Sequence, residues 1–195
     1  FSNIPFSGTV KSIVDRKWEF THLFLKEKRL IKGKIEKGMK VGLWETYIAE
    51  SEHTKSMGNE EVGQLVESGN YKNGNKDGIW LIYSGTFLSQ KIPYKNGKKE
   101  GKGLGYYEDG NLKSELNFKN NKKEGVEKYF YPSGILSEII NFKNDLVTGT
   151  HKLYHENGNI KRIKKYKIEN GIVYCDADDK IFDLDGKFVR EQKGC

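Results

Sequence analysis

A repeat of about 24 residues is the feature that most constrains how this chain can fold. Four columns recur in register between residues 30 and 167: an aliphatic residue, a central aromatic, a glycine and a second aromatic. A fixed period of this size indicates a repeat architecture in which each unit packs on its neighbours. The central aromatics are Tyr71, Tyr94, Phe118, Phe142 and Tyr166, and the glycines are Gly42, Gly78, Gly101, Gly125 and Gly149.

Each unit has the pattern of a β-hairpin. Residues 112–118 alternate apolar and polar side chains, which is the period of a strand. Residues 119–125 have the composition of a turn, and residues 126–131 read as the returning strand. The sequence therefore predicts an all-β fold, an elongated single-layer antiparallel meander of consecutive hairpins. We expect about ten strands plus degenerate capping hairpins, with the recurrent glycines at turn ends or strand starts.

The segment Tyr94-Lys-Asn-Gly-Lys-Lys-Glu-Gly101 and its counterparts resemble the MORN-repeat family, in particular its bacterial variant. The resemblance covers residues 30–167 and implies a single-layer sheet with no catalytic residues. It also implies that the repeats mediate interaction with proteins or with membrane lipid. Because the bacterial variant is often described as an antitoxin component, it implies toxin neutralisation as an alternative role.

Two regions flank the array. Residues 1–29 contain Trp18, Phe20, His22 and Phe24 in alternation and are predicted to form a capping segment, since terminal repeats are usually atypical. Residues 168–195 are predicted to form a degenerate hairpin or cap around Asp185 and Gly186. Within the array, residues 48–62 form a polar insertion, and loops of that length are often functional.

The predicted alternation assigns side chains to two faces. If Phe118 lies opposite Val126, every recurrent column falls on one structural face, and the other face carries side chains that do not recur. An exposed aromatic patch of that kind is typical of a partner surface. The alternative is that the terminal segments cover it. The partner-binding candidates are Trp44, Trp80, Tyr107, Tyr129, Tyr131 and Leu153.

A lysine-rich rim is predicted along one edge of the meander. The long turn of each unit begins with lysine, and these turns carry most of the net charge of +7. Such a rim could hold an anionic membrane surface. The alternative is that it serves solubility and protects strand edges from pairing. The rim lysines are Lys72, Lys95, Lys119 and Lys143.

The sequence offers little catalytic chemistry. His151 and His155 would lie about 13 Å apart on a strand, too far to share a metal ion. A calcium loop in the acidic segment 176–186 lacks its ligands, because Ile181 and Gln192 stand where acids are required. A Cys175–histidine nucleophile is conceivable but has little support. We therefore expect no enzymatic activity, no metal and no cofactor.

Composition bears on partners and compartment. Lysine dominates the 34 basic residues, whereas nucleic-acid readers favour arginine, so we expect no nucleic-acid partner. Because the chain begins at Phe1 rather than Met, we expect a removed leader and a location in the bacterial envelope or outside the cell, with the cytoplasm as the alternative. Cys175 and Cys195 form a disulfide or stay as two thiols. The predicted function is a non-enzymatic scaffold that binds a protein partner through the non-recurrent face and the insertion.

Overall fold

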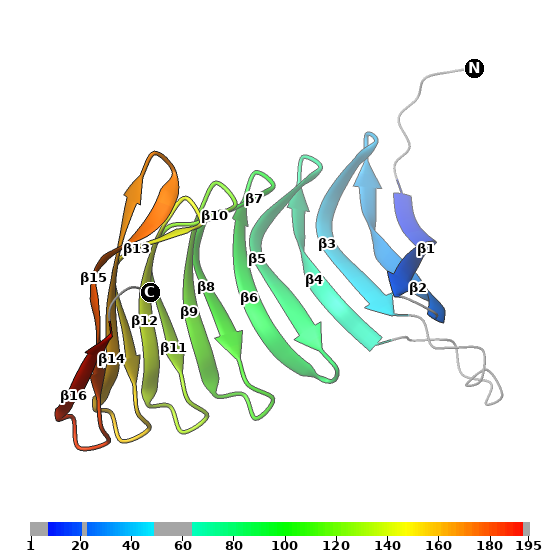
Figure 1. Cartoon of the computed structure of the whole chain (residues 1–195). Coiled ribbons are helices and arrows are strands. Elements are labelled where there is room, and N and C mark those ends of the chain that lie inside the picture. Colours follow the sequence, from blue (N-terminus) through cyan, green and yellow to red (C-terminus); the bar gives the residue numbers. More distant parts are fainter. Residues whose placement is uncertain (1–7, 21–22, 49–63, 193–195) are drawn as a thin grey trace. The chain divides into compact units, whose positions relative to one another are not determined.

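The computed structural model describes the backbone of residues 8–20, 23–48 and 64–192, and side chains at residues 9, 29, 31–48, 64–175 and 179–192. Sixteen strands in these ranges follow one another in chain order in an open antiparallel sheet (Figure 1). The all-β prediction and the consecutive hairpins are confirmed. Among the described residues, no helix has the length and apolarity needed to cross a membrane.

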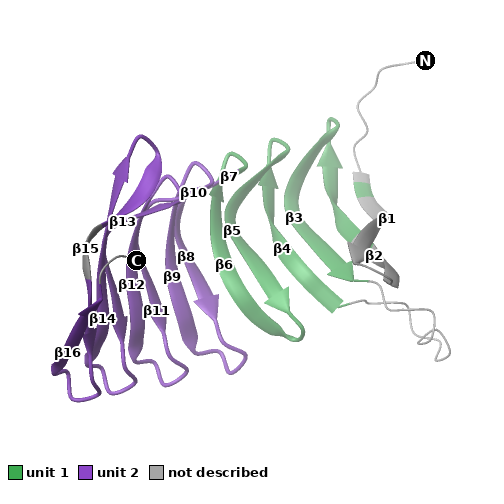
Figure 2. Ribbon diagram, viewed as in Figure 1, with its two compact units in different colours: residues 1–97 green, residues 98–195 purple. Residues whose placement is uncertain are grey.

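Unit 1 comprises residues 1–97 (Figure 2). Its first two strands form a hairpin in which Trp18 and Phe20 lie on β1 and Phe24 lies on β2, so the alternating residues do not share one strand. His22 is outside the described residues, and the bounds of the predicted capping segment stay a prediction. Each strand pairs with the next one along the chain. The strands are β1 (Gly8–Phe20), β2 (Leu23–Glu36), β3 (Met39–Ile48), β4 (Gln64–Lys72), β5 (Asn75–Ser84) and β6 (Phe87–Lys95).

Unit 2 comprises residues 98–195 and continues the hairpin pattern (Figure 2). Its last two strands form the predicted hairpin around Asp185 and Gly186. The strands are β7 (Lys98–Lys99), β8 (Gly101–Tyr106), β9 (Leu112–Lys119), β10 (Lys122–Lys123), β11 (Gly125–Phe130), β12 (Leu136–Lys143), β13 (Leu146–Tyr154), β14 (Ile160–Glu169), β15 (Ile172–Phe182) and β16 (Phe188–Gln192).

The turns at the lysine rim are two residues long. Asn73 and Gly74 have φ values of 50° and 77°, and two consecutive positive values define the type I′ turn that suits a twisted hairpin. The seven-residue turns expected from composition are therefore wrong, because the chain returns to strand directly after each pair. The pairs are Lys37–Gly38, Asn73–Gly74, Asn96–Gly97, Asn120–Asn121, Asn144–Asp145 and Asn170–Gly171.

The recurrent glycines mark irregular positions in the returning strands. Gly101 and Gly125 begin β8 and β11, as predicted, while Gly42, Gly78 and Gly149 lie inside β3, β5 and β13. All five have positive φ, which side chains disfavour. Near Gly78 the register shifts, since Asn70 pairs with Asp77 but Ser68 pairs with Leu81. The glycines thus accommodate bulges that follow the tight turns.

Because the turns are shorter than predicted, residues on the returning strands lie on the face opposite to the one predicted for them. Phe118 pairs with Lys123, and further along the same hairpin Ser114 pairs with Tyr129. The expectation that Phe118 lies opposite Val126 is therefore wrong. A two-residue turn and a seven-residue turn pair residues of opposite parity, so side chains assigned to one face lie on the other.

Two faces follow from the observed register. The aromatic face, as we call it, carries the central aromatics together with Trp44, Trp80, Glu127 and Tyr129. The opposite face carries the second aromatics, each paired with an aliphatic residue of the next strand. These pairs are Tyr47–Leu65, Tyr83–Leu88, Tyr106–Leu112, Phe130–Leu136 and Tyr154–Ile160.

Candidate interaction surfaces

The aromatic face of unit 1 is a ladder of four rings. Trp44, Tyr71, Trp80 and Tyr94 meet edge to face, with successive ring centroids 5.7, 5.2 and 6.1 Å apart. This geometry matches the preference of aromatic quadrupoles. Each indole covers a glycine of the preceding strand, and a Cβ at Gly69 would lie 2.3 Å from Trp80 Cδ2. The ladder is therefore a thin core made within one layer.

Lysines cover these rings from the solvent side. The ammonium group of Lys40 lies 4.2 Å from the Trp44 ring centroid, and that of Lys76 lies 3.6 Å from the Trp80 ring. Lys123 covers Phe142 at 4.4 Å in unit 2. These lysines stand two positions before a recurrent glycine, so they form a structural column that stabilises the rings through cation–π attraction. Burial lowers the pKa of Lys40.

The two tryptophans are not available as partner contacts. Trp44 is 3% exposed and Trp80 is 1% exposed, and their indole nitrogens donate to the backbone oxygens of Val41 and Asn70. The prediction that they form a partner surface followed from the wrong face assignment. Rings, lysines and glycines of the same and neighbouring strands contact them.

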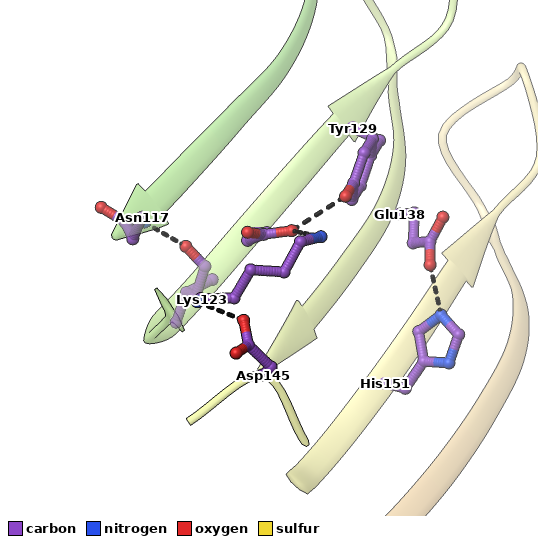
Figure 3. Close-up of polar contacts among 8 residues, drawn as sticks. Asn117, Lys123, Tyr129, Glu138, Asp145 and His151 are labelled. Atoms are coloured by element: carbon purple, nitrogen blue, oxygen red, sulfur yellow. Dashed lines mark hydrogen bonds and ion pairs between the residues drawn. The ribbon is translucent and has the colours of Figure 1, made fainter. Parts of the chain in front are cut away.

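The aromatic face of unit 2 holds a buried carboxylate, which Lys123 and Tyr129 contact; both of these residues are labelled in Figure 3. Glu127 is fully buried, and its Oε2 accepts hydrogen bonds from Lys123 Nζ at 2.9 Å and from the Tyr129 hydroxyl at 2.8 Å. Its Oε1 has no partner in the described part of the chain. Burial raises the pKa of Tyr129, and the hydrogen bond to Glu127 raises it further. The Tyr129 hydroxyl thus stabilises the buried carboxylate of Glu127 and is not part of an exposed surface.

A histidine–carboxylate contact and an ion pair also lie on the same face. His151 Nε2 lies 2.8 Å from Glu138 Oε1 (Figure 3). The imidazole stacks on Tyr166 with ring centroids 6.2 Å apart. Arg162 binds the buried carboxylate of Asp179. Leu153, another predicted partner contact, is half-buried among these pairs. The carboxylates of Glu138 and Asp179 are thus bound by neighbouring side chains.

Tyr107 and Tyr131 connect successive repeats. Their hydroxyls donate to the backbone oxygens of Phe130 and Tyr154, each at 2.7 Å, and His155 lies 3.2 Å from Phe182 O at the equivalent position. The position of these three residues therefore recurs from repeat to repeat, as a position required by the fold does. This recurrence counts against the prediction that Tyr107 and Tyr131 are specific to partner binding. Both phenols lie half-buried beside the turns that join the units.

The remaining candidate chemistry has structural partners as well. Cys175 is disulfide-bonded, which removes the thiol that a cysteine–histidine nucleophile needs. Cys195, the other cysteine of the sequence, lies outside the described residues, as do His22 and His53. Asp183 Oδ1 accepts the backbone N–H groups of Asp185 and Lys187, as a turn acid does. Within the described ranges, no three metal-ligating side chains come together.

The rim lysines are exposed, and the turns that carry them are held together by hydrogen bonds. Within unit 2, the backbone N–H of Asn120 donates to Glu100 Oε2 at 2.8 Å, and that of Asn144 donates to Glu124 Oε2 at 2.9 Å. The acids that precede the recurrent glycines therefore cap the next turn. The predicted lysines are exposed and each directly precedes one of the two-residue turns, namely Lys72, Lys95, Lys119 and Lys143.

The opposite face presents exposed aliphatic side chains that sequence reasoning did not identify. Leu43 is 58% exposed, Ile79 is 51% exposed and Val126 is 43% exposed. Each directly follows a recurrent glycine, and the same position is Lys102 in another copy. The sequence did carry a signal for this surface, because the position after each recurrent glycine varies while the glycine itself does not. The wrong register concealed it by placing Val126 in the structural face.

Comparison with known families identifies part of this array. The MORN repeat variant matches residues 99–120, 123–144 and 147–167, which coincide with hairpins of unit 2. No curated protein matches the chain. The chain therefore carries MORN variant repeats between residues 99 and 167, and the copies around Gly42 and Gly78 share the same columns outside the matched residues.

Proposed function

We propose that this β-sheet protein is a non-enzymatic scaffold that binds a protein partner through the opposite face of its sheet. The exposure of Leu43 and Ile79 on that face of unit 1 is the observation that carries the proposal, and Val126 is exposed at the equivalent position in unit 2. Exposed aliphatic side chains that vary among otherwise regular repeats are not required by the fold. MORN repeats generally mediate protein interactions, which is consistent with this role.

The aromatic face is less suited to recognition. Its rings are covered by lysines, and its carboxylates are engaged by Lys123, Arg162 and Lys76. A partner would have to displace these contacts before it could form its own, at a cost in free energy. The opposite face offers side chains that gain by burial without such losses. The insertion lies almost wholly outside the described residues, and its role in binding stays a prediction.

The absence of catalysis is part of the proposal, and the contacts of the titratable groups support it. The most buried carboxylates, Glu127 and Asp179, are bound by cations of the same sheet face. His151 is held between Glu138 and the ring of Tyr166. Such pairs stabilise a repeat fold, and each group is occupied by a neighbour rather than aimed at a substrate.

A location in the bacterial envelope or outside the cell is part of the proposal. The disulfide at Cys175 supports it, because disulfides persist in oxidising compartments and are rare in the cytosol. Mass mapping of the protein taken directly from its host, with free thiols blocked at lysis, checks this point. Alkylated Cys175 in that sample would contradict the proposed location.

A second candidate function is peripheral attachment to anionic lipid through the lysine rim. The exposure of Lys72, Lys95, Lys119 and Lys143 favours it. Lysine lacks the planar fork that gives arginine selective phosphate contacts, so this binding would be weak and would fall with salt. Toxin neutralisation stays a prediction from the family resemblance.

The proposed function is tested by capture of the partner from host extract with matched variants. One variant carries Leu43→Asp and Ile79→Asp on the opposite face of unit 1, and its control carries Lys72→Asp and Lys95→Asp at exposed rim positions. Both keep the tight turns and the aromatic ladder. The proposal expects the opposite-face variant to lose the captured protein and the control to retain it. Equal capture by both variants would exclude this surface.

A further inference from the structure

A row of alternating lysine and isoleucine crosses the opposite face of unit 2. Lys128 pairs with Ile139, Ile139 with Lys152, Lys152 with Ile163, and Ile163 with Lys180. Since paired residues point to the same side, the five side chains form one line across β11, β12, β13, β14 and β15. We call it the Lys–Ile row.

The lysines of this row have no ionic partner in the described part of the protein. Lys128 and Lys180 are exposed and Lys152 is half-buried, in contrast to Lys102, which binds Glu115 at 2.7 Å on the same face. An acid flanks the row at each end, since Glu115 is the cross-strand neighbour of Lys128 and Glu191 is that of Lys180, although neither forms an ion pair with its lysine. The cations of the row, with Lys152 farthest from both acids, attract an anionic partner. The isoleucines between them add apolar surface to be buried.

The row is specific to unit 2. The corresponding line in unit 1 runs through Lys32, Glu45, Ser68, Leu81 and Lys91, where an acid and a serine interrupt any alternation. Residues required by the fold would recur in both units. In unit 2 the same line begins with Leu104 and Glu115, so the alternation is confined to β11–β15. The Lys–Ile row therefore reflects something other than the demands of the sheet.

The spacing of the row matches an α-helix laid across the strands. Strands lie about 4.8 Å apart, so lysines on every second strand are about 9.6 Å apart, with an isoleucine midway. Seven residues of α-helix span about 10.5 Å, and positions three or four residues along lie midway on the same side. An extended peptide repeats its side every 6.6–6.8 Å or so and does not match. The twist of the sheet, about 20° per strand, concentrates the contact around Lys152.

We infer that the opposite face of unit 2 binds an amphipathic helix of a partner protein that presents an acid every seven residues, with aliphatic side chains between the acids. Each carboxylate pairs with Lys128, Lys152 or Lys180, and each aliphatic side chain packs on Ile139 or Ile163. The row spans about 19 Å over four strand spacings, which corresponds to about 13 helical residues. This inference rests on the proposed function and names the chemistry of the partner.

A synthetic helical peptide of about three heptads tests the inference. It carries Glu at the first position and Leu at the fourth position of each heptad, with alanine and glutamine elsewhere. A second peptide has the same composition, but its Glu and Leu stand on opposite sides of the helix. Binding of both is followed by fluorescence anisotropy at low salt and at about 0.15 M salt.

Two protein variants give the matched comparison. The row variant is Lys128→Glu, Lys152→Glu and Lys180→Glu, and the rim variant is Lys119→Glu, Lys122→Glu and Lys143→Glu, with the same change in net charge. We expect the row variant to bind the in-register peptide at least about tenfold more weakly than wild type, and the rim variant to differ by less than about threefold. A milder set, Lys→Gln at the row positions, replaces the first if its thermal unfolding shows a loss of fold.

Equal binding of the two peptides would overturn the inference, because the register of the helix would not matter. Equal weakening by the row and rim variants would also overturn it, since only net charge would count. Binding to phosphatidylserine vesicles that the row variant loses, without peptide binding, would assign the row to lipid instead. If the peptide fails but Leu43→Asp with Ile79→Asp still abolishes partner capture, the inference fails and the proposed function stands.

Discussion

The indole of Trp80 lies directly over Gly69 of the neighbouring strand, so that a Cβ at residue 69 would come within 2.3 Å of indole Cδ2. The indole occupies the space that a side chain would fill. This pairing of a large ring with a glycine permits a single layer to bury a tryptophan to 1% exposure.

The Trp80–Gly69 contact predicts a non-additive pair of substitutions. Gly69→Ala should destabilise the protein because the methyl group collides with the ring, and Trp80→Leu should destabilise it by a few kcal/mol through lost burial, about 3–5 kcal/mol being the range for complete truncation to alanine. The double variant should be more stable than the sum of the two losses predicts. Chemical denaturation of all four proteins measures the coupling. Simple additivity would mean that the ring does not occupy the glycine position.

The buried Glu127 predicts a strong effect at Lys123. Lys123→Met should reduce the free energy of unfolding by about 3–5 kcal/mol, because it leaves a buried carboxylate with only the Tyr129 hydroxyl. Adding Glu127→Gln removes the uncompensated charge and should restore part of the loss. Lys122→Met, at an exposed neighbour, is the control and should stay within about 0.5 kcal/mol of wild type. Equal effects at both lysines would contradict the network.

Tyr129 predicts a loss of stability at high pH. Its pKa is raised in the folded protein by burial and by Glu127, whereas an unfolded tyrosine has a pKa of about 10. Above about pH 10 the unfolded chain therefore binds fewer protons than the folded one, and the free energy of unfolding falls as pH rises. The Tyr129→Phe variant should show a shallower fall, with Tyr71 and Tyr94 responsible for part of what remains. Identical slopes for variant and wild type would contradict the assignment.

The lysine rim predicts weak, salt-sensitive attachment to anionic vesicles. Each lysine near such a surface contributes at most about 1 kcal/mol, so Lys119→Gln with Lys143→Gln should weaken binding by at most about thirtyfold at low salt. Binding should largely disappear at about 0.15 M salt. Co-sedimentation with anionic and neutral vesicles across a salt series measures both effects. Tight binding that survives physiological salt would put the lipid role ahead of the protein partner.

The repeat and the class of fold could be predicted because they depend on local patterns. The alternation of residues 112–118 reports a strand whatever lies beside it, and five glycines in register report a hairpin array. The hairpin around Asp185 and Gly186 was predictable for the same reason, since Asp183 and Gly186 have turn chemistry.

The faces could not be predicted with the same success, because they depend on the exact length of each turn. Asn120 and Asn121 both adopt positive φ, so Phe118 meets Lys123 and not Val126. The positions of the asparagines, two residues after each central aromatic, were a usable signal for a type I′ turn. This signal was missed because the prediction used composition alone and assigned all of residues 119–125 to the turn.

Hydroxyl-radical footprinting of the protein, free and in complex with its captured partner, tests most directly whether the opposite face is the interaction surface. Leu43, Ile79 and Val126 are exposed in the free protein and should be oxidised readily there. The account predicts that the partner protects Leu43 and Ile79 of unit 1, while the oxidation of Tyr71 and Tyr94 on the aromatic face of the same unit stays unchanged. Protection of Tyr71 and Tyr94, with Leu43 and Ile79 still oxidised, would contradict it.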